Sequence, residues 1–175
     1  GADAAAVAAR AACRELQEEA GLALQPAQLV RWAHWITPGA MRRRFDTHFF
    51  LALAPAGQQP RLDRAEASDL RWVAPADQAC VEQPSDAFPI TAPTQLVLRE
   101  LALALRETPS PDDLLAAAPR RCIHTVLPKM LGDQVVFPWD AQYRAIDAAG
   151  LDWDAAALAS RAGWPSRLPA HVAHP

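Results

Sequence analysis

The sequence predicts an α/β fold, in which long helices and short strands contribute to one domain. Both patterns occur, because apolar residues recur every three to four positions in some segments and every second position in others. A helix is expected at residues 3–19, strands at 29–36 and 44–53, and a second helix at 93–106. The chain has 175 residues and is 51% hydrophobic, which is enough to bury a core.

The first predicted helix, at residues 3–19, is rich in alanine and contains no proline and no internal glycine. Asp3 is a suitable capping residue at its start, and Gly21 follows where a left-handed residue commonly ends a helix. Its apolar residues recur at helical spacing: Ala9, Cys13, Leu16 and Ala20. This face is therefore the one that we expect to be buried.

Two strands are expected after this helix. Residues 29–36 are rich in Val, Ile and Trp, and a Thr-Pro-Gly turn ends them. In residues 44–53 one face alternates as Phe45, Thr47, Phe49, Leu51 and Leu53. Asp46 and His48 share the other face of this strand, because side chains two residues apart point the same way.

After these strands the sequence predicts a short strand at 69–73, the helix at 93–106 and a helical turn at 112–118. Pro93 suits the first turn of the helix, whose leucines form a buried stripe. Val126, Val135, Val136 and Phe137 suggest a hairpin around Gly132-Asp133. The irregular order of residues beyond Trp139 predicts a lightly packed tail or a linker.

Charge and cysteine usage restrict the class of protein. The net charge of −3 argues against nucleic acid or an anionic membrane surface as a partner. The sequence has no apolar run long enough for a transmembrane helix and no signal segment at its start. Three widely spaced cysteines, Cys13, Cys80 and Cys122, indicate reduced thiols in a cytoplasmic protein.

The first helix also carries an acidic face. Glu15, Glu18 and Glu19 fall within an arc of about 100° on the side opposite the apolar face. Three carboxylates there offer the hard oxygen ligands that Mg²⁺ or Mn²⁺ prefers, and Arg14 can pair with Glu18 one turn on. The alternative is an acidic helix face that only contacts solvent.

Residues 14–22 read Arg-Glu-Leu-Gln-Glu-Glu-Ala-Gly-Leu, which resembles the catalytic half of the Nudix box. The resemblance implies that Glu15, Glu18 and Glu19 bind Mg²⁺ or Mn²⁺ and that Arg14 orients them. It also makes Glu15 a candidate to orient or deprotonate the attacking water. The implied activity is hydrolysis of a diphosphate linkage in a small-molecule nucleoside diphosphate derivative.

The first half of the box departs from the family pattern. Ala6 stands where the family has a glutamate, and the family's first glycine would precede Gly1. Either an insertion separates the two halves, or the preceding loop and strands are missing from this sequence. The implied fold is a mixed sheet between helices, incomplete at the N-terminus, with a Nudix domain at residues 1–118 and a C-terminal extension or linker at 119–175.

Further segments are similar to coenzyme A and acyl-coenzyme A diphosphatase-like Nudix proteins: residues 37–38, 43–52, 66–75 and 93–94. Glu66 and Asp69 are candidates for a remote catalytic acid, or are acids that face solvent. Arg42, Arg43 and Arg44 are candidates to bind substrate phosphates, or are ordinary surface cations. His48 is a candidate substrate contact, although a partly buried structural histidine is the alternative that we favour.

The sequence therefore predicts a Nudix hydrolase, with coenzyme A or an acyl-coenzyme A as the first candidate for its substrate. Two alternatives remain open. The chain is a Nudix-like module that binds nucleotides without catalysis, or it is the Nudix part of a larger multidomain hydrolase. The sequence does not predict an oligomeric state.

Overall fold

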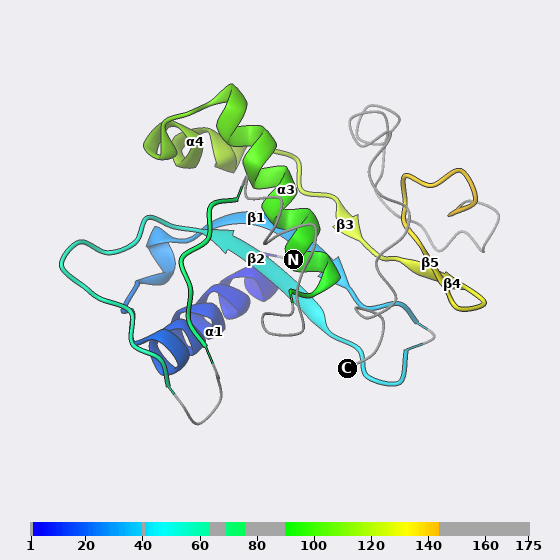
Figure 1. Ribbon diagram of the computed structural model, residues 1–175, viewed down its shortest axis with the longest axis horizontal. Coiled ribbons are helices and arrows are strands. Elements are labelled where there is room, and N and C mark those ends of the chain that lie inside the picture. Colours follow the sequence, from blue (N-terminus) through cyan, green and yellow to red (C-terminus); the bar gives the residue numbers. More distant parts are fainter. Residues whose placement is uncertain (1, 40, 64–68, 76–89, 144–175) are drawn as a thin grey trace.

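The computed structural model describes residues 2–39, 41–63, 69–75 and 90–143 (Figure 1). In these ranges the elements along the chain are α1 (Ala2–Ala20), the short helix η1 (Pro26–Gln28), β1 (Val30–Ile36), β2 (Asp46–Leu51), α3 (Ala92–Glu107), α4 (Pro111–Ala117), the short helix η2 (Ala118–Arg120), β3 (Thr125–Val126), β4 (Lys129–Leu131) and β5 (Gln134–Val136). None of the described helices is both long and apolar enough to cross a bilayer.

The central sheet is mixed. Its strand order is β2-β1-β3, with β1 antiparallel to β2 and parallel to β3. His34 of β1 lies directly opposite His48 of β2, and the register shifts between Arg31 and Ala33. The strands β4 and β5 form a separate antiparallel hairpin.

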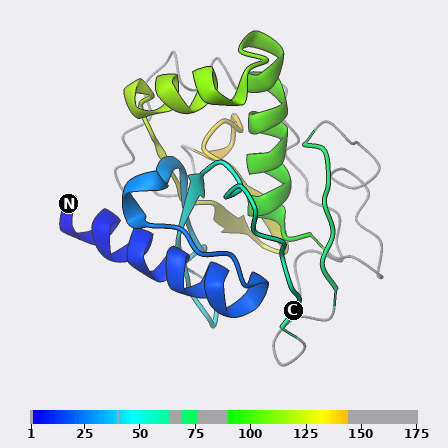
Figure 2. The same cartoon turned by 90° about the vertical axis from the view of Figure 1, so that its left-hand side faces the viewer.

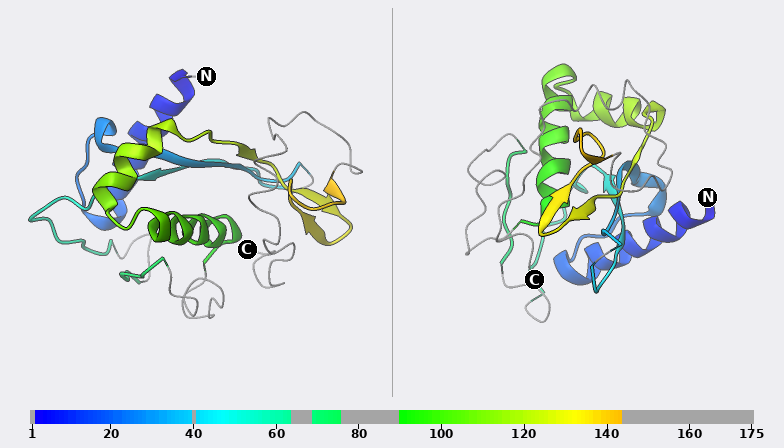
Figure 3. Two further views of the ribbon diagram at one scale, coloured as in Figure 1. Left: turned by 90° about the horizontal axis from the view of Figure 1, so that it is seen from above. Right: turned by 90° about the vertical axis from the view of Figure 1, so that its right-hand side faces the viewer.

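Helices cover both faces of this sheet. Figures 2 and 3 show α1 on one side of the three strands and α3 on the other. The apolar core lies mainly on the α3 side, where Trp35 of β1 and Leu96 of α3 join Phe137, which has no exposed surface. The expected α/β fold, a mixed sheet between helices, is therefore confirmed.

The C-terminal end of α1 is fixed by backbone hydrogen bonds. Gly21 has a φ of 65°, and its N–H donates to the carbonyl oxygen of Gln17 over 3.0 Å. The N–H groups of Arg61 and Asp63 also donate to the carbonyl oxygens of Ala20 and Glu19, over 2.8 Å and 3.1 Å. The predicted helix end at Gly21 is confirmed, and the loop after β2 supplies donors for the final carbonyls.

Most of the other predicted elements are present, with small differences at their ends. The two expected strands are β1 and β2, and the expected helices are α3 and α4. β4 and β5 form the expected hairpin around Gly132-Asp133, but Val126, which was expected in it, lies in β3 instead. The tail beyond residue 143 lies outside the described residues. β3, within the segment predicted as an extension, pairs with β1, while the boundary at residue 118 stays a prediction.

Two local predictions were wrong. No strand forms at residues 69–73, because Trp72 is 76% exposed and the segment has no buried face to pack against a sheet. Asp3 does not precede the first helix, since α1 already includes Ala2. The alanine-rich composition carries the helix one residue further toward the N-terminus than the capping pattern indicates.

Candidate functional site

The acidic face of α1 is exposed. Glu15, Glu18 and Glu19 all point away from the buried side of the helix, on which Ala9 is only 8% exposed. Arg14 lies between two of them: its Nη2 is 3.6 Å from Glu15 Oε1, and its Nε is 3.7 Å from Glu18 Oε2. These ion pairs hold two of the carboxylates over one turn of the helix.

This donor set fits a hard divalent cation. Carboxylate oxygens are the ligands that Mg²⁺ and Mn²⁺ prefer, and exposed glutamates can rotate toward an ion with little steric resistance. The segment from residue 14 to residue 22 places all three glutamates within two turns, so their proximity follows from helix geometry alone.

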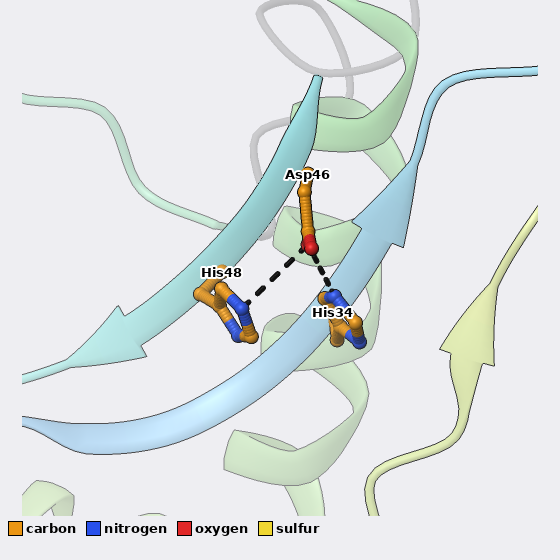
Figure 4. A group of neighbouring side chains, drawn as sticks. All are labelled: His34, Asp46 and His48. Carbon is orange, nitrogen blue, oxygen red and sulfur yellow. Dashed lines mark hydrogen bonds and ion pairs between the residues drawn. The ribbon is translucent and has the colours of Figure 1, made fainter. Parts of the chain in front are cut away.

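A second group of side chains lies on the central sheet. His34 comes from β1, and Asp46 and His48 come from β2 (Figure 4). His34 Nε2 is 2.5 Å from Asp46 Oδ1, and His48 Nε2 is 3.6 Å from the same oxygen. One ligand atom from each of the three residues lies within 4.8 Å of the others. We call these three residues the His–Asp cluster.

Strand register brings this cluster together. His34 is paired with His48 across the two antiparallel strands, so the two imidazoles point to the same face. Their rings are stacked, with centroids 4.2 Å apart and an interplanar angle of 6°. Asp46 lies two residues before His48 and therefore shares its face, as the sequence predicted.

A third strand contributes to the cluster. The Nδ1 atom of His34 and the hydroxyl Oγ1 of Thr125 in β3 share a hydrogen bond of 2.8 Å. β3 runs parallel to β1, and in the register of this pair Thr125 lies beside His34. The ring of His34 is therefore held at both nitrogens, one by the hydroxyl and the other by Asp46.

Burial is the largest influence on the pKa of His48. Burial lowers the pKa of His48 below its ordinary value, the nearby His34 lowers it further, and Asp46 acts in the opposite direction. The lowered pKa favours the neutral form of His48, in which one ring nitrogen carries a lone pair. Its Nδ1 atom is buried and has no hydrogen-bond partner among the described residues.

Among the described residues, Arg42, Arg44 and Asp69 belong neither to the acidic face of α1 nor to the His–Asp cluster. Arg42 and Arg44 are exposed in the connection between β1 and β2, where the Nε of Arg44 donates to the carbonyl oxygen of Thr37 over 3.3 Å. Glu66 lies outside the described residues. Asp69 is exposed and accepts a hydrogen bond of 2.6 Å from Arg71, which lowers the pKa of Asp69.

Within the described residues, His48 therefore lies in a group with His34 and Thr125, which the sequence analysis did not predict as its partners. Asp46 was predicted to share its strand face, but His34 and Thr125 were not singled out. The period-two pattern of β1 places His34 on one face, but only the pairing of the strands shows that this face is the one that carries His48.

The comparison with known families covers the segment that contains the box residues. The family model of the NUDIX domain matches residues 2–92. The chain belongs to the Nudix family. The matched Nudix segment includes α1 with its glutamates and also β1 and β2 with the His–Asp cluster. No curated protein and no solved structure shows significant similarity to the chain.

Membership of the Nudix family confirms the coarse prediction made from the box residues. It supports a hydrolase of the Nudix type that acts on small-molecule nucleoside diphosphate derivatives. Nudix enzymes generally use divalent metal ions, and the exposed glutamates of α1 have the donor chemistry for such an ion.

Proposed function

We propose that this Nudix protein hydrolyses the diphosphate linkage of a nucleoside diphosphate derivative, using Mg²⁺ or Mn²⁺ held by Glu15, Glu18 and Glu19. One observation carries this proposal. The complete Arg-Glu-aliphatic-x-Glu-Glu-x-Gly-aliphatic string begins on α1 and ends just after it, with its glutamates exposed on the helix, inside the segment that matches the family.

Each residue of the box has a physical role in this proposal. Arg14 restrains Glu15 and Glu18 through its two ion pairs, which reduces the rotamer freedom that metal binding removes. Glu15 accepts the proton of the attacking water at a carboxylate oxygen. A bound divalent ion supplies charge neutralisation for the diphosphate and lowers the pKa of water.

A remote acid and a phosphate-binding loop complete the proposed site. Asp69 is already engaged by Arg71, so we assign the remote catalytic acid to Glu66. Arg42 and Arg44 are exposed on the loop before β2 and have guanidinium groups suited to forked hydrogen bonds with phosphates. His48 is partly buried against His34, which supports its structural role more than direct contact with a substrate.

Coenzyme A or an acyl-coenzyme A is the proposed substrate, since residues 37–38, 43–52 and 66–75 resemble that branch of the family. The discriminating assay compares Mg²⁺-dependent cleavage of coenzyme A with cleavage of a nucleoside diphosphate sugar, by chromatography of the monophosphate products. Cleavage of the sugar derivative alone would refute the proposed substrate and retain the diphosphate chemistry.

The catalytic assignment is tested by Glu18→Gln and Glu19→Gln. Each change keeps the size of the side chain but removes an anionic ligand, so several kcal/mol of charge stabilisation are lost and kcat falls about 100-fold or more. Glu107→Gln is the matched control, because Glu107 is an exposed glutamate at the end of α3. Unchanged rates in both box variants would refute the site.

The cleavage assay, combined with calorimetry, distinguishes hydrolysis from the alternative function, which is nucleotide binding without catalysis. Ala6, which is exposed on α1, stands where the family carries another glutamate, and this departure favours a nucleotide-binding module without catalysis. Such a module would bind a nucleoside diphosphate in calorimetry and release no monophosphate in the presence of Mg²⁺ or Mn²⁺. Binding without product at either ion would select this alternative.

A further inference from the structure

The His–Asp cluster has ligand chemistry that the box glutamates lack. It offers two imidazole nitrogens and one carboxylate, whereas α1 offers only carboxylate oxygens. Imidazole nitrogen suits Zn²⁺, Co²⁺ and other borderline transition ions, whereas Mg²⁺ prefers oxygen. The two groups are therefore expected to select different metals.

The distances within the cluster are close to those of a metal site. Ligands of a tetrahedral zinc ion, with bonds of about 2.0–2.1 Å, lie roughly 3.4 Å apart. The 3.6 Å between His48 Nε2 and Asp46 Oδ1 already matches this spacing. The 2.5 Å between His34 Nε2 and Asp46 Oδ1 must widen, because in this arrangement the carboxylate is hydrogen-bonded to the ring directly.

The side chains must rotate before all three residues can bind one ion. The stacked rings direct their lone pairs along nearly parallel lines, so one imidazole must turn before both can point at the same atom. Rotation of a histidine ring about its second side-chain torsion has a broad energy profile. The side chain of Asp46 is 65% exposed at the start of β2 and can move outward as the rings turn.

The surroundings of His34 resemble those of a metal ligand. A ligating histidine commonly has its other ring nitrogen held by a second hydrogen bond, and Thr125 provides this for His34. The histidine side chains are only 15% and 12% exposed, so a bound ion would be partly shielded on their side. The exposed side of Asp46 leaves an open position for water or for another ligand.

From these observations the geometry points to a second metal site, in which His34 Nε2, His48 Nε2 and the carboxylate of Asp46 bind one Zn²⁺-like transition ion. Three protein ligands with an open fourth position define the site. It is separate from the glutamates of α1, and its occupation does not depend on diphosphate hydrolysis.

The test is a titration of the 175-residue chain with Co²⁺, followed by visible absorption, and with Zn²⁺, followed by calorimetry. A tetrahedral Co²⁺ site gives strong visible bands, and a large excess of Mg²⁺ should leave them in place. Asp46→Asn and His48→Gln are each expected to remove the strong bands and to weaken Zn²⁺ binding more than the 10–100-fold typical for loss of a second-shell partner. Asp46→Asn keeps the proposal testable if His48→Gln does not fold, because Asp46 is exposed.

Two further variants separate this site from other binding. His124→Gln changes a partly buried histidine outside the cluster and should leave the Co²⁺ bands unchanged. Thr125→Val should weaken Zn²⁺ binding about tenfold, because it removes the hydrogen bond that orients His34 and keeps all three ligands. Weak octahedral Co²⁺ absorption in the unmodified chain, or strong bands that persist in Asp46→Asn, would overturn the proposal.

Glu18→Gln distinguishes this inference from the proposed hydrolysis. The variant removes a box carboxylate and leaves all three residues of the cluster in place, so its Co²⁺ bands should match those of the unmodified chain. Loss of the strong Co²⁺ bands in Glu18→Gln would assign the ion to α1 and would refute the separate site.

Discussion

The acidic face of α1 and the His–Asp cluster are two groups of ionisable side chains that are brought together in different ways, one by a single helix and the other by strand pairing. The glutamates lie within five residues of one another, and their geometry follows from a single helix. The cluster joins β1, β2 and β3, and its hydrogen bond between His34 and Thr125 spans 91 residues of sequence. The first group is therefore specified locally, whereas the second exists only when the sheet has formed.

The acidic face of α1 and the His–Asp cluster also differ in their exposure to solvent. The side chains of Glu15 and Glu18 are 59% and 58% exposed, so solvent screens their charges and weakens their ion pairs with Arg14. The two histidines are largely covered, and their positions are set by strand pairing and ring stacking. A local motif thus tolerates solvent, while a group assembled from distant strands depends on packing for its geometry.

The largest expected effect comes from weakening the sheet beneath the cluster. Phe137 is fully buried, stacks on Trp139 and contacts the edge of Trp35 in β1. Phe137→Ala should lower the free energy of unfolding by about 3–5 kcal/mol, because the cavity in this core cannot close completely. Urea unfolding followed by tryptophan fluorescence measures this loss.

Unfolding in the presence of Zn²⁺ tests whether the His–Asp cluster forms only when the sheet is folded. If the cluster binds the ion only in the folded state, a Zn²⁺ concentration of 100 times its Kd should restore about 2.7 kcal/mol to Phe137→Ala. The double variant with Asp46→Asn serves as the control and should recover little. Equal recovery in the two proteins would show that the stabilising ion binds elsewhere.

A smaller effect is expected at the end of the box helix. Gly21 has a φ of 65°, and a Cβ there would lie 3.7 Å from the Cβ of Arg61, which is an ordinary contact. Gly21→Ala should therefore cost only the strain of a left-handed residue, about 1–2 kcal/mol. Thermal unfolding measures the cost, and Gly39→Ala, at a glycine without positive φ, is the control. Equal losses in the two variants would contradict the assigned role of the backbone conformation.

The smallest effect should come from Tyr143, which lies beyond the hairpin and is 7% exposed. Its hydroxyl donates to the carbonyl oxygen of Leu127 over 2.6 Å, and Tyr143→Phe should cost about 1 kcal/mol at neutral pH. Burial raises the pKa of Tyr143 to about 12. Because the folded state disfavours ionisation of Tyr143, the free energy of unfolding should keep its full value below pH 10. It should fall as the pH rises from 10 to 12, where the phenol ionises more readily in the unfolded state.

Urea unfolding at pH 8 and pH 11 measures the pH dependence of both proteins. The decline over this interval should be smaller in Tyr143→Phe, which has no phenol to ionise. An equal decline in the two proteins would assign the alkaline loss of stability to other groups.

The success of sequence reasoning depended on how local each feature was. The helix end at Gly21 and the strands β1 and β2 follow from residues close together in the chain. The strand expected at 69–73 did not form, because its pattern does not reveal whether any surface covers Trp72. Short-range periodicity cannot supply that information.

The same limit explains the candidate site. The box string identifies Glu15, Glu18 and Glu19 without knowledge of the fold, because one helix determines their spacing. His34 carries no recognisable motif, and its relation to His48 depends on the register of two strands. Shifting that register by one residue would place the two imidazoles on opposite faces.

The backbone hydrogen bonds from Arg61 and Asp63 to the end of α1 bear on how this protein can vary. Both donors are main-chain N–H groups, so the side chains at these two positions can change without removing the bonds. The length of the segment between Leu51 and Arg61 cannot change as freely, because it determines which N–H groups reach the helix. Substitutions at positions 61 and 63 should therefore be tolerated, whereas insertions and deletions in this loop should be rare.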